Sequence, residues 1–573
     1  MLPRGIVASL LLFLSVMDTA PLGATACMSF AQYSRRPQGN SSTGPLALPY
    51  MRPDVGCRTF NSSAVETLVD HLVGRMKDPD LARLFQNTYP NTLDTTIKWF
   101  NPDLTFVVTG DIPAEWLRDS SNQFKNYLPL LAYDEPLREL TRGVINLQAR
   151  YITQYPYCNA FQPPPESGLP PQGGSGDTGA HISPPDDLKI VWTCGYELDS
   201  LLSFIQLSRL YYDYSGDTTV FTYDDGKWFK AMESVLKVIE DQTIGTFNED
   251  GNVVSYYNIS GPKQQYMKNH GRGPPKAAVG LIGTTYRPSD DVVYFPYNIP
   301  HQAMAVVELK GFAALISDLG QAATVAAGTK RRTSSRPDPR QDGTGAEGDA
   351  EQEPPPPDLA TLLERHSGLR QIALTRSKTV EDALWEYGTV PTKKWGEVFA
   401  YEVDGYGGAA IQDDANVPSL ISLPYLGFVN TTSDIYKNTR KMLLSPTGSG
   451  NPYYAHGPAI RGVSSPHIDE AHVWPMGIVS EVITGTDDQE ILDALEWLKN
   501  STTGLGLIHE SVHSHNIQGR PAWANSYFGE ALVYIAETRP HLLFDDGAGF
   551  SVKGLFETEL STDDDLEMGI MGG

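Results

Sequence analysis

The sequence predicts an all-α fold, an α/α-barrel in which long loops form a pocket at one end. Apolar residues recur at helical spacing from Ser63 onward, and long loops rich in Gly, Pro and aromatic residues separate the helical segments. Strand-like runs, such as Leu104 to Val108, are short and scattered. A doubly wound α/β fold would need regularly alternating strands, which this pattern does not contain.

The helical segments can be followed along the chain. A first apolar stripe includes Val65, Leu68 and Leu72, and a second begins at Leu198 and continues to a segment that ends near Tyr214. Further helices are predicted near residues 119–131, 135–153, 227–241, 297–318, 359–384, 416–427, 433–443, 471–484, 488–499 and 523–537. About a dozen helices joined by long loops favour two concentric rings over a simple bundle.

The first 26 residues have the pattern of a signal peptide. Arg4 gives a basic start, Ile6 to Val16 is apolar, and Ala24-Thr25-Ala26 offers small residues for cleavage. The sequence therefore predicts secretion, with an uncleaved luminal anchor as the alternative. Residues 27–62 form an extended lead-in, and residues 63–573 form one catalytic domain.

Two stretches of low complexity interrupt this domain. Residues 162–186 are crowded with Pro and Gly, and residues 321–358 mix Ala, Gly and charge with a run of four prolines. Such composition buries too little surface to offset chain entropy, so both are predicted to be loosely ordered insertions.

The cysteines and sequons agree with the secretory pathway. The four cysteines permit two disulfides, and pairing of neighbours, Cys27 with Cys57 and Cys158 with Cys194, is the expected arrangement. No CxxC pair is present, which argues against a zinc site. Five Asn-X-Ser/Thr sequons predict a glycoprotein: Asn40, Asn61, Asn258, Asn430 and Asn500.

The chain is strongly acidic, with a formal net charge of -25 and a pI of about 4.8. Such a protein repels phosphate backbones and anionic membrane surfaces, so neither nucleic acid nor, after signal cleavage, a membrane is an expected partner. Neutral sugars suffer no such repulsion. The predicted state is a monomer that acts on an oligosaccharide or glycan.

Acidic, aromatic and Arg side chains gather in six short segments, a mixture suited to sugars. Acids accept hydrogen bonds from hydroxyls, aromatic faces cover the apolar side of a sugar ring, and Arg donates to oxygens. Any one of these carboxylates alone could be a helix cap, and any one Trp could belong to the core. The candidate substrate-binding residues are Glu115, Trp116, Arg118, Asp119, Arg287, Asp290, Asp413, Asp414, Asn416, His467, Trp474 and Trp523.

Glycoside cleavage needs two carboxyl groups, one protonated and one ionised. Asp199 is the candidate acid, because it opens an amphipathic helix and is expected at the pocket rim with a raised pKa. Glu510 is the candidate base, in a Gly-rich loop that leads to the helix near Trp523. Glu530, within that helix, is the alternative base.

At these residues the chain resembles glycoside hydrolase family 125, the inverting exo-α-1,6-mannosidases. The resemblance covers about Ser63 to Arg539 and is carried by segments such as Ala114-Glu115-Trp116-Leu117-Arg118-Asp119-Ser120 and Asp413-Asp414-Ala415-Asn416. It implies an (α/α)6 barrel, removal of non-reducing terminal α-mannose with no metal or other cofactor, and Asp199 as the acid. The α-1,6 linkage and inversion are implied by the resemblance only.

Three other functions remain open from the sequence. They are a glucoamylase-like or trehalase-like hydrolase on the same barrel, a non-catalytic carbohydrate-binding relative, and a calcium-assisted mannosidase. The last would use Asp413-Asp414 and Asp290-Asp291 as ligands, although these acids suit sugar hydroxyls equally well.

Overall fold

A computed structural model describes residues 27–173, 179–261, 267–334, 357–446, 450–521 and 524–557. The predicted signal peptide, residues 335–356 of the second insertion, and Trp523 lie outside the described residues.

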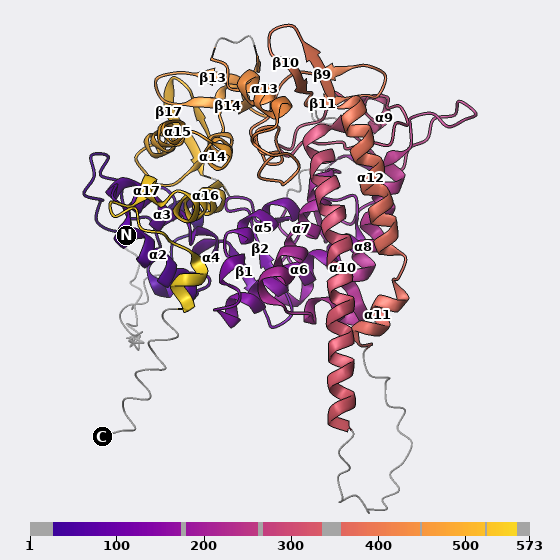
Figure 1. Cartoon of the computed structure of the whole chain (residues 1–573), viewed down its shortest axis with the longest axis horizontal. Coiled ribbons are helices and arrows are strands. Elements are labelled where there is room, and N and C mark those ends of the chain that lie inside the picture. The colour runs from indigo at the N-terminus through magenta and orange to yellow at the C-terminus, as the bar shows by residue number, and fades with distance from the viewer. Residues whose placement is uncertain are drawn as a thin grey trace, which may run out of the picture.

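Helices dominate the structure, which confirms the helical character predicted from the sequence (Figure 1). The α-helices are α1 (Phe30–Tyr33), α2 (Ser63–Arg75), α3 (Pro79–Thr88), α4 (Asn91–Thr95), α5 (Leu117–Lys125), α6 (Glu135–Gln154), α7 (Leu198–Ser215), α8 (Thr219–Thr243), α9 (Lys268–Gly271), α10 (Ile299–Ser334), α11 (Leu359–Arg365), α12 (Leu369–Tyr387), α13 (Asp434–Leu443), α14 (Pro475–Thr484), α15 (Asp488–Asn500), α16 (Ala524–Thr538) and α17 (Pro540–Leu543). The 3-10 helices are η1 (Val55–Cys57), η2 (Leu128–Leu130) and η3 (Pro165–Ser167).

Small antiparallel sheets, which the sequence pattern did not predict, join the helices at their ends. The strands are β1 (Ile97–Phe100), β2 (Thr105–Val107), β3 (Glu115–Trp116), β4 (Ala160–Phe161), β5 (His181–Ser183), β6 (Val191–Thr193), β7 (Asn258–Ser260), β8 (Tyr297–Asn298), β9 (Thr389–Thr392), β10 (Gly396–Phe399), β11 (Glu402–Val403), β12 (Ala409–Ala410), β13 (Tyr454–His456), β14 (Arg461–Ser465), β15 (Asp469–Val473), β16 (His509–His513) and β17 (Asn516–Pro521). The largest sheet has the order β13-β14-β15-β16-β17. Every strand pair in the described part of the chain is antiparallel, so no parallel α/β sheet forms there.

Local sequence explains where several helices begin. The Ser62 hydroxyl accepts a hydrogen bond from the Val65 N–H at the start of α2, and Asp134 caps α6 in the same way through the Leu137 N–H. Asp78 caps α3, whose first residue is Pro79, where a missing N–H costs nothing.

The helices pack in a recurring pattern. Helix α7 lies between α5 and α10, and α16 packs against both α5 and α14. A second set covers this first one, because α6 contacts α7 and α8, α12 contacts α10, and α15 contacts α14. One large apolar core runs through all of these contacts.

Two sequence-based helix predictions were wrong. Residues 416–427 form a series of turns instead of a helix, since Pro418, Pro424 and a left-handed Gly427 interrupt helical hydrogen bonding. The predicted helix over 471–484 begins only at Pro475, because residues 469–473 form β15.

The described parts of the two insertions, residues 162–173, 179–186 and 321–334, are more ordered than predicted. Helix α10 continues through residues 321–334 and projects from the body of the molecule (Figure 1). Within 162–186, η3 forms, β5 pairs with β7, and the buried Gln162 side chain donates to the Gln172 carbonyl. Tertiary hydrogen bonds thus order Pro- and Gly-rich segments that have no apolar period of their own.

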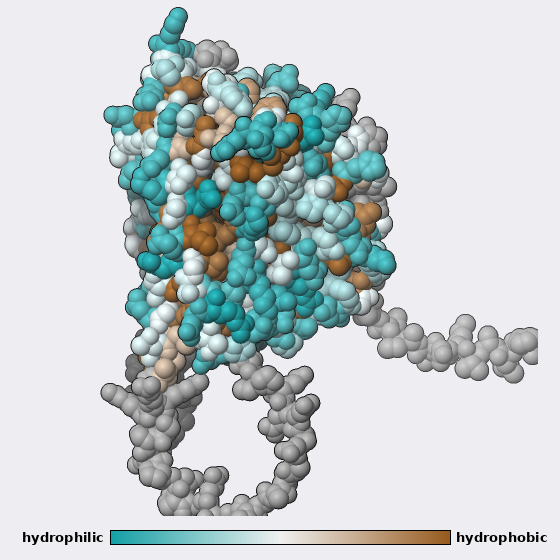
Figure 2. All heavy atoms as spheres, turned by 90° about the vertical axis from the view of Figure 1, so that its right-hand side faces the viewer, coloured by the Kyte–Doolittle hydropathy of each residue, from teal (hydrophilic) through white to brown (hydrophobic). Residues whose placement is uncertain are grey.

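Both predicted disulfides form, Cys27–Cys57 and Cys158–Cys194. The lead-in packs on the body through Arg52, which is buried and pairs with Asp94 and Glu66. The face seen in Figure 2 is mostly hydrophilic, with apolar side chains in separate patches. Among the described residues, no helix combines the length and apolar character needed to cross a membrane.

Candidate active site

A small pocket lies where six separated segments of the chain meet. They are the loop before β3, the junction of β3 and α5, the turn at Asp290, the turn at Asn416, the residue before α14, and strand β16. The lining residues are Thr109, Asp111, Ile112, Trp116, Arg118, Asp119, Asp290, Asn416, Trp474 and Glu510. A larger cavity of about 390 Å³, beside Phe247 and Lys276, has Asp241 as its one acidic lining residue. Unlike that cavity, the smaller pocket gathers several acids with aromatic side chains.

The walls of the pocket carry polar atoms without partners. The indole N–H groups of Trp116 and Trp474 and the Oδ1 atom of Asn416 are buried, and none has a hydrogen-bond partner within the described part of the chain. Buried polar groups are almost always hydrogen-bonded, so an unpartnered set around one pocket indicates a site for a ligand. Two indole rings and an amide match the hydroxyls and apolar face of a sugar.

The floor is a buried charge cluster around Arg118. Its guanidinium lies 2.7 Å from Glu197, 3.1 Å from Asp119, 3.4 Å from Asp290 and 3.5 Å from Asp199. Arg118 and Glu197 are nearly inaccessible to solvent. A single cation therefore holds four carboxyl groups, of which Asp119 and Asp290 reach the pocket.

Glu510 has the electrostatics of a group that titrates near neutrality. Burial raises the pKa of its carboxyl to about 7, and the negative charges of Asp111, Asp290 and Asp119 add to this effect, while His467 opposes it. Glu510 lies on β16 and not in the predicted Gly-rich loop. The strand pairing with β15 and β17 gives it a rigid support that a loop would lack.

Asp119 shares these features in the deeper part of the pocket. Burial raises its pKa to about 6, and the charges of Asp290 and Asp199 act in the same direction, whereas Arg118 opposes them. Its side chain is 7% exposed, compared with 45% for Asp290. Asp119 thus faces the closed end, and Asp290 faces the mouth.

Asp290 has an unusual backbone. Its φ of 65° lies in the left-handed region, which a residue with a Cβ rarely adopts. Such conformations persist where the surrounding structure enforces them, and they cluster at functional sites. Here the turn directs a carboxyl group to the pocket lining beside Arg118.

The expected position of Asp199 was wrong. Asp199 is fully buried and does not line the pocket. It lies 3.1 Å from the His301 ring and 3.5 Å from Arg118. Burial opposes ionisation of Asp199, but the charges of His301 and Arg118 outweigh it and lower its pKa, the reverse of the predicted shift. The amphipathic helix that suggested a rim position is surrounded by other helices, so both of its faces are covered.

Glu530, the alternative base, also lies away from this pocket. The Tyr425 hydroxyl donates to its carboxylate at 2.9 Å, and the residue lines a separate groove beside α16. Glu510 lines the pocket from β16, whereas Glu530 lies on α16 outside the pocket lining. The structure therefore distinguishes two glutamates that the sequence could not.

The remaining predicted binding residues divide into two groups. Trp116, Arg118, Asp119, Asp290, Asn416 and Trp474 line the pocket as expected. The other described candidates lie outside the lining and contact structural partners. Glu115 is buried and accepts from the Val107 N–H, and Arg287 pairs with Glu402 at 2.6 Å. Asp413 accepts from the Leu420 and Ile421 N–H groups, Asp414 accepts from the Ser289 hydroxyl, and His467 contacts Asp291 at 3.3 Å.

His467 and Asp413 show how burial and partners act on these supporting groups. Burial opposes protonation of His467, yet its hydrogen bond to Asp291 and the charge of Asp290 raise its pKa to about 9. Burial raises the pKa of Asp413 to about 8, although two backbone N–H groups oppose this shift. His467 therefore acts on Glu510 as a nearby positive charge, while Asp413 fixes the 420–421 turn.

The sequence-based candidates omitted several residues of the site. Asp111, Thr109 and Ile112 line the pocket, and Glu197 and His301 belong to the cluster below it. Asp111 lies in the same polar segment as Trp116 and Arg118, so proximity in sequence could have identified it. His301 sits inside a helical apolar run, where no sequence signal marks it.

Three comparisons relate this chain to known proteins. The family described as "Metal-independent alpha-mannosidase (GH125)" matches residues 78–533. The "Meiotically up-regulated gene 157 protein" of Schizosaccharomyces pombe is 40% identical over 532 residues, which cover 90% of this chain and 94% of that protein. A solved Streptococcus pneumoniae structure, described as a metal-independent α-mannosidase in a non-productive substrate complex with α-1,6-mannobiose, has a TM-score of 0.66 and 28% identity. It matches 83% of this chain and 99% of its own.

Proposed function

Because this chain belongs to the metal-independent α-mannosidases of family GH125, we propose that it removes non-reducing terminal α-mannose, α-1,6-linked, from mannosides or N-glycans by inverting hydrolysis. The observation that carries the proposal is the pocket in which Glu510 and Asp290 accompany unpartnered indole N–H groups. The α-1,6 linkage is taken from the ligand of the Streptococcus pneumoniae relative.

Glu510 is the proposed general base. With a pKa raised to about 7, its carboxylate is basic enough to take a proton from water and is still ionised in a useful fraction near neutral pH. Inversion places the water between this carboxylate and the anomeric carbon, opposite the leaving group.

Asp290 replaces Asp199 as the proposed general acid. In an exo-acting enzyme the closed end of the pocket holds the terminal sugar, so the glycosidic oxygen points toward the mouth. Asp290 lies there, partly exposed, whereas Asp199 is sealed beneath Arg118. An acid must reach the leaving oxygen within hydrogen-bond distance, which Asp199 cannot do without displacing Arg118.

The helix packing supports an (α/α)6 barrel as the fold behind this site. The proposed inner ring is α5, α7, α10, the 416–427 turns, α14 and α16, closed by the contact of α16 with α5. The proposed outer ring is α6, α8, α12, α13, α15 and α3. In this arrangement a stretch of turns replaces one inner helix.

Secretion and glycosylation are also proposed. Both disulfides suit an oxidising compartment, and four of the five sequon asparagines, Asn40, Asn61, Asn430 and Asn500, are exposed. Mass spectrometry of the protein from culture medium tests both proposals, through the mature N-terminus and the sequon masses.

The function is tested by following sugar release from mannobioses of each linkage, maltose and trehalose, with and without EDTA. We expect α-1,6-mannobiose to be cleaved equally well in EDTA, with β-mannose as the first product by NMR. Cleavage of maltose or trehalose instead would transfer the assignment to a glucoamylase-like or trehalase-like enzyme. Loss of activity in EDTA with recovery in calcium would support the metal-assisted alternative.

A further inference from the structure

We propose that Asn159, held by the Cys158–Cys194 disulfide, is a positioning residue for the sugar pocket: it fixes Glu197, and Glu197 fixes Arg118. The inference rests on the proposed function, because the position of Arg118 matters only if the pocket binds and cleaves a sugar. Asn159 itself lies outside the pocket lining and touches no substrate.

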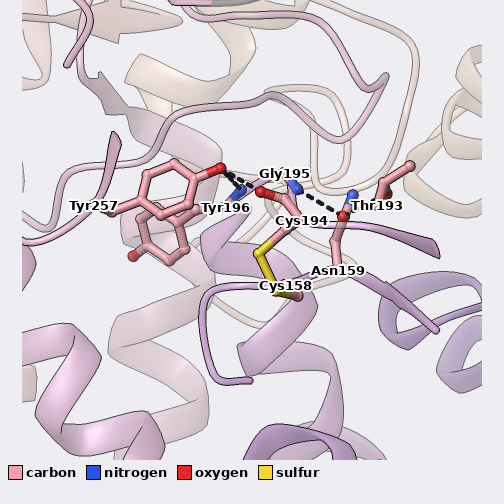
Figure 3. The surroundings of a disulfide bond; sticks show 7 residues. All are labelled: Cys158, Asn159, Thr193, Cys194, Gly195, Tyr196 and Tyr257. Atoms are coloured by element: carbon pink, nitrogen blue, oxygen red, sulfur yellow. Dashed lines mark hydrogen bonds between the residues drawn. A yellow bond between two sulfur atoms is a disulfide. The ribbon is translucent and has the colours of Figure 1, made fainter. Parts of the chain in front are cut away.

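Asn159 forms hydrogen bonds through both its side-chain amide and its backbone carbonyl, and these bonds join three segments. Its Oδ1 atom accepts from the Thr193 hydroxyl at 2.8 Å and from the Gly195 N–H at 3.0 Å (Figure 3). Its Nδ2 atom donates to Glu197 at 3.0 Å. Its backbone carbonyl accepts from the N–H of Leu117, the residue before Arg118. The same residue therefore supports both the backbone and the side-chain partner of Arg118.

Glu197 passes this constraint to the pocket. It is fully buried and accepts hydrogen bonds from Arg118 at 2.7 Å, Asn159 at 3.0 Å and the Ser200 hydroxyl at 3.0 Å. Burial raises the pKa of Glu197 well above its ordinary value, and Arg118 opposes that effect. A carboxylate that is costly to bury depends on each of its donors, so removing Asn159 weakens the anion that orients the guanidinium.

The disulfide fixes the segments on which Asn159 acts. Asn159 lies between Cys158 and the first residue of β4, Cys194 directly follows β6, and these two strands pair. The Tyr257 hydroxyl donates to the Cys194 carbonyl and accepts from the Tyr196 N–H (Figure 3). Both cysteines are buried. The disulfide therefore joins residues 158 and 194 next to the hydrogen bond that the Gly195 N–H donates to Asn159.

The second disulfide supplies a matched control. Cys27–Cys57 spans 30 residues and Cys158–Cys194 spans 36, so the two close loops of similar length and should constrain the unfolded chain similarly. In the part of the chain that the structure describes, the second disulfide adjoins Asn159, which donates to Glu197, and Glu197 accepts from Arg118 in the pocket.

The first experiment compares C158A/C194A with C27A/C57A, both assayed on α-1,6-mannobiose well below their unfolding temperatures. We expect kcat/KM of C158A/C194A to fall by about tenfold to a hundredfold, mostly through KM, since misplacing a group that grips the sugar by about 1 Å can cost this much. C27A/C57A should retain wild-type kcat/KM. Equal kcat/KM for the two variants would overturn the proposal.

The second experiment uses N159D, in which both disulfides are kept, so its result does not depend on whether a disulfide variant folds. At low pH the introduced carboxyl is protonated and can donate to Glu197 as the amide does, whereas at higher pH it ionises and repels Glu197. The ratio of N159D to wild-type kcat/KM should therefore fall as pH rises, while N159A shows a loss that does not vary with pH. A pH-independent ratio for N159D would show that Asn159 has a merely structural role.

Leaving-group dependence separates this inference from the proposed function. The N159A loss should be the same on mannobiose and on an activated aryl mannoside, because gripping of the terminal sugar is affected and proton donation is not. Wild-type protein inactive on every mannoside would overturn the proposed function and this inference with it. Active wild-type protein with fully active N159A would overturn this inference alone.

Discussion

Carboxyl groups lie both at the floor of the pocket and at its mouth, but they differ in burial and in their partners. At the floor, Arg118, Glu197, Asp199 and His301 are buried and held by one another. At the mouth, Asp290 contacts Arg118 at 3.4 Å but has a side chain that is 45% exposed, and Glu510 is half-buried. A carboxyl group whose partners are fixed serves as support. Glu510, which faces the pocket and has a pKa raised to about 7, is available for proton transfer.

The largest expected effect comes from the mouth. E510Q should lower kcat by about 10²–10⁴-fold on both a mannobiose and an activated aryl mannoside, because activation of water is needed whatever the leaving group. E530Q is the matched control, since Glu530 bonds to Tyr425 away from the pocket and should keep wild-type kcat. An active E510Q with an inactive E530Q would reverse the assignment of the base.

D290N should give a loss of comparable size on mannobiose and a clearly smaller one on the aryl mannoside, because a good leaving group needs little protonation. D199N provides the comparison from the floor: any loss it causes should be equal on the two substrates. If D199N, and not D290N, showed the dependence on leaving group, the acid would be Asp199 despite its burial.

Changes at the floor should lower stability as well as sugar binding. R118M leaves Glu197 and Asp199 buried without their cation, and breaking such a buried pair costs about 3–5 kcal/mol. E510Q removes no paired charge and should change the free energy of unfolding by less than about 1 kcal/mol. Urea unfolding of both variants checks this contrast, which equal losses would contradict.

The smallest expected effect is a shift in the pH dependence of kcat/KM. Glu510 must be ionised to act as a base, and its pKa is raised to about 7, so kcat/KM should rise with pH until about pH 7. D111N removes a negative charge near Glu510, which makes ionisation easier and should move this limb to lower pH. H467Q removes the charge that favours ionisation and should move it to higher pH. Shifts of the same sign in both variants would exclude Glu510 as the titrating group.

Short segments of sequence were sufficient to identify much of the pocket. Trp116, Arg118 and Asp119 lie within four positions, and the acids and aromatic residues of this segment reach the pocket together because β3 leads directly into α5. The structure confirms the pairing of neighbouring cysteines, which is one of the three connectivities that the sequence allows. Helix existence was predictable from apolar spacing, although Pro418 and Pro424 prevented one expected helix.

The role of each carboxyl group required the tertiary structure. Asp199 and Asp290 both follow polar and aromatic residues in the sequence, yet one is sealed against His301 and the other opens to the mouth. Asp413 and Asp414 have the composition of sugar ligands, but backbone N–H groups bind Asp413 and the Ser289 hydroxyl binds one oxygen of Asp414. The five-stranded sheet that carries Glu510 was equally hidden, because β16 pairs with β15 from a distant part of the chain, with His472 opposite His513.

The sequence by itself determined the helical class, the acidic net charge and the inventory of acids and aromatic residues from which the pocket is made. These properties depend on local spacing and on composition, both of which can be read along the chain. Only the tertiary structure decided which acids are buried with a cation, which face the pocket, and that Glu510 lies on a strand. Solvation and the distances between charges set the chemistry of a carboxyl group, and both come from segments that meet only when the chain folds.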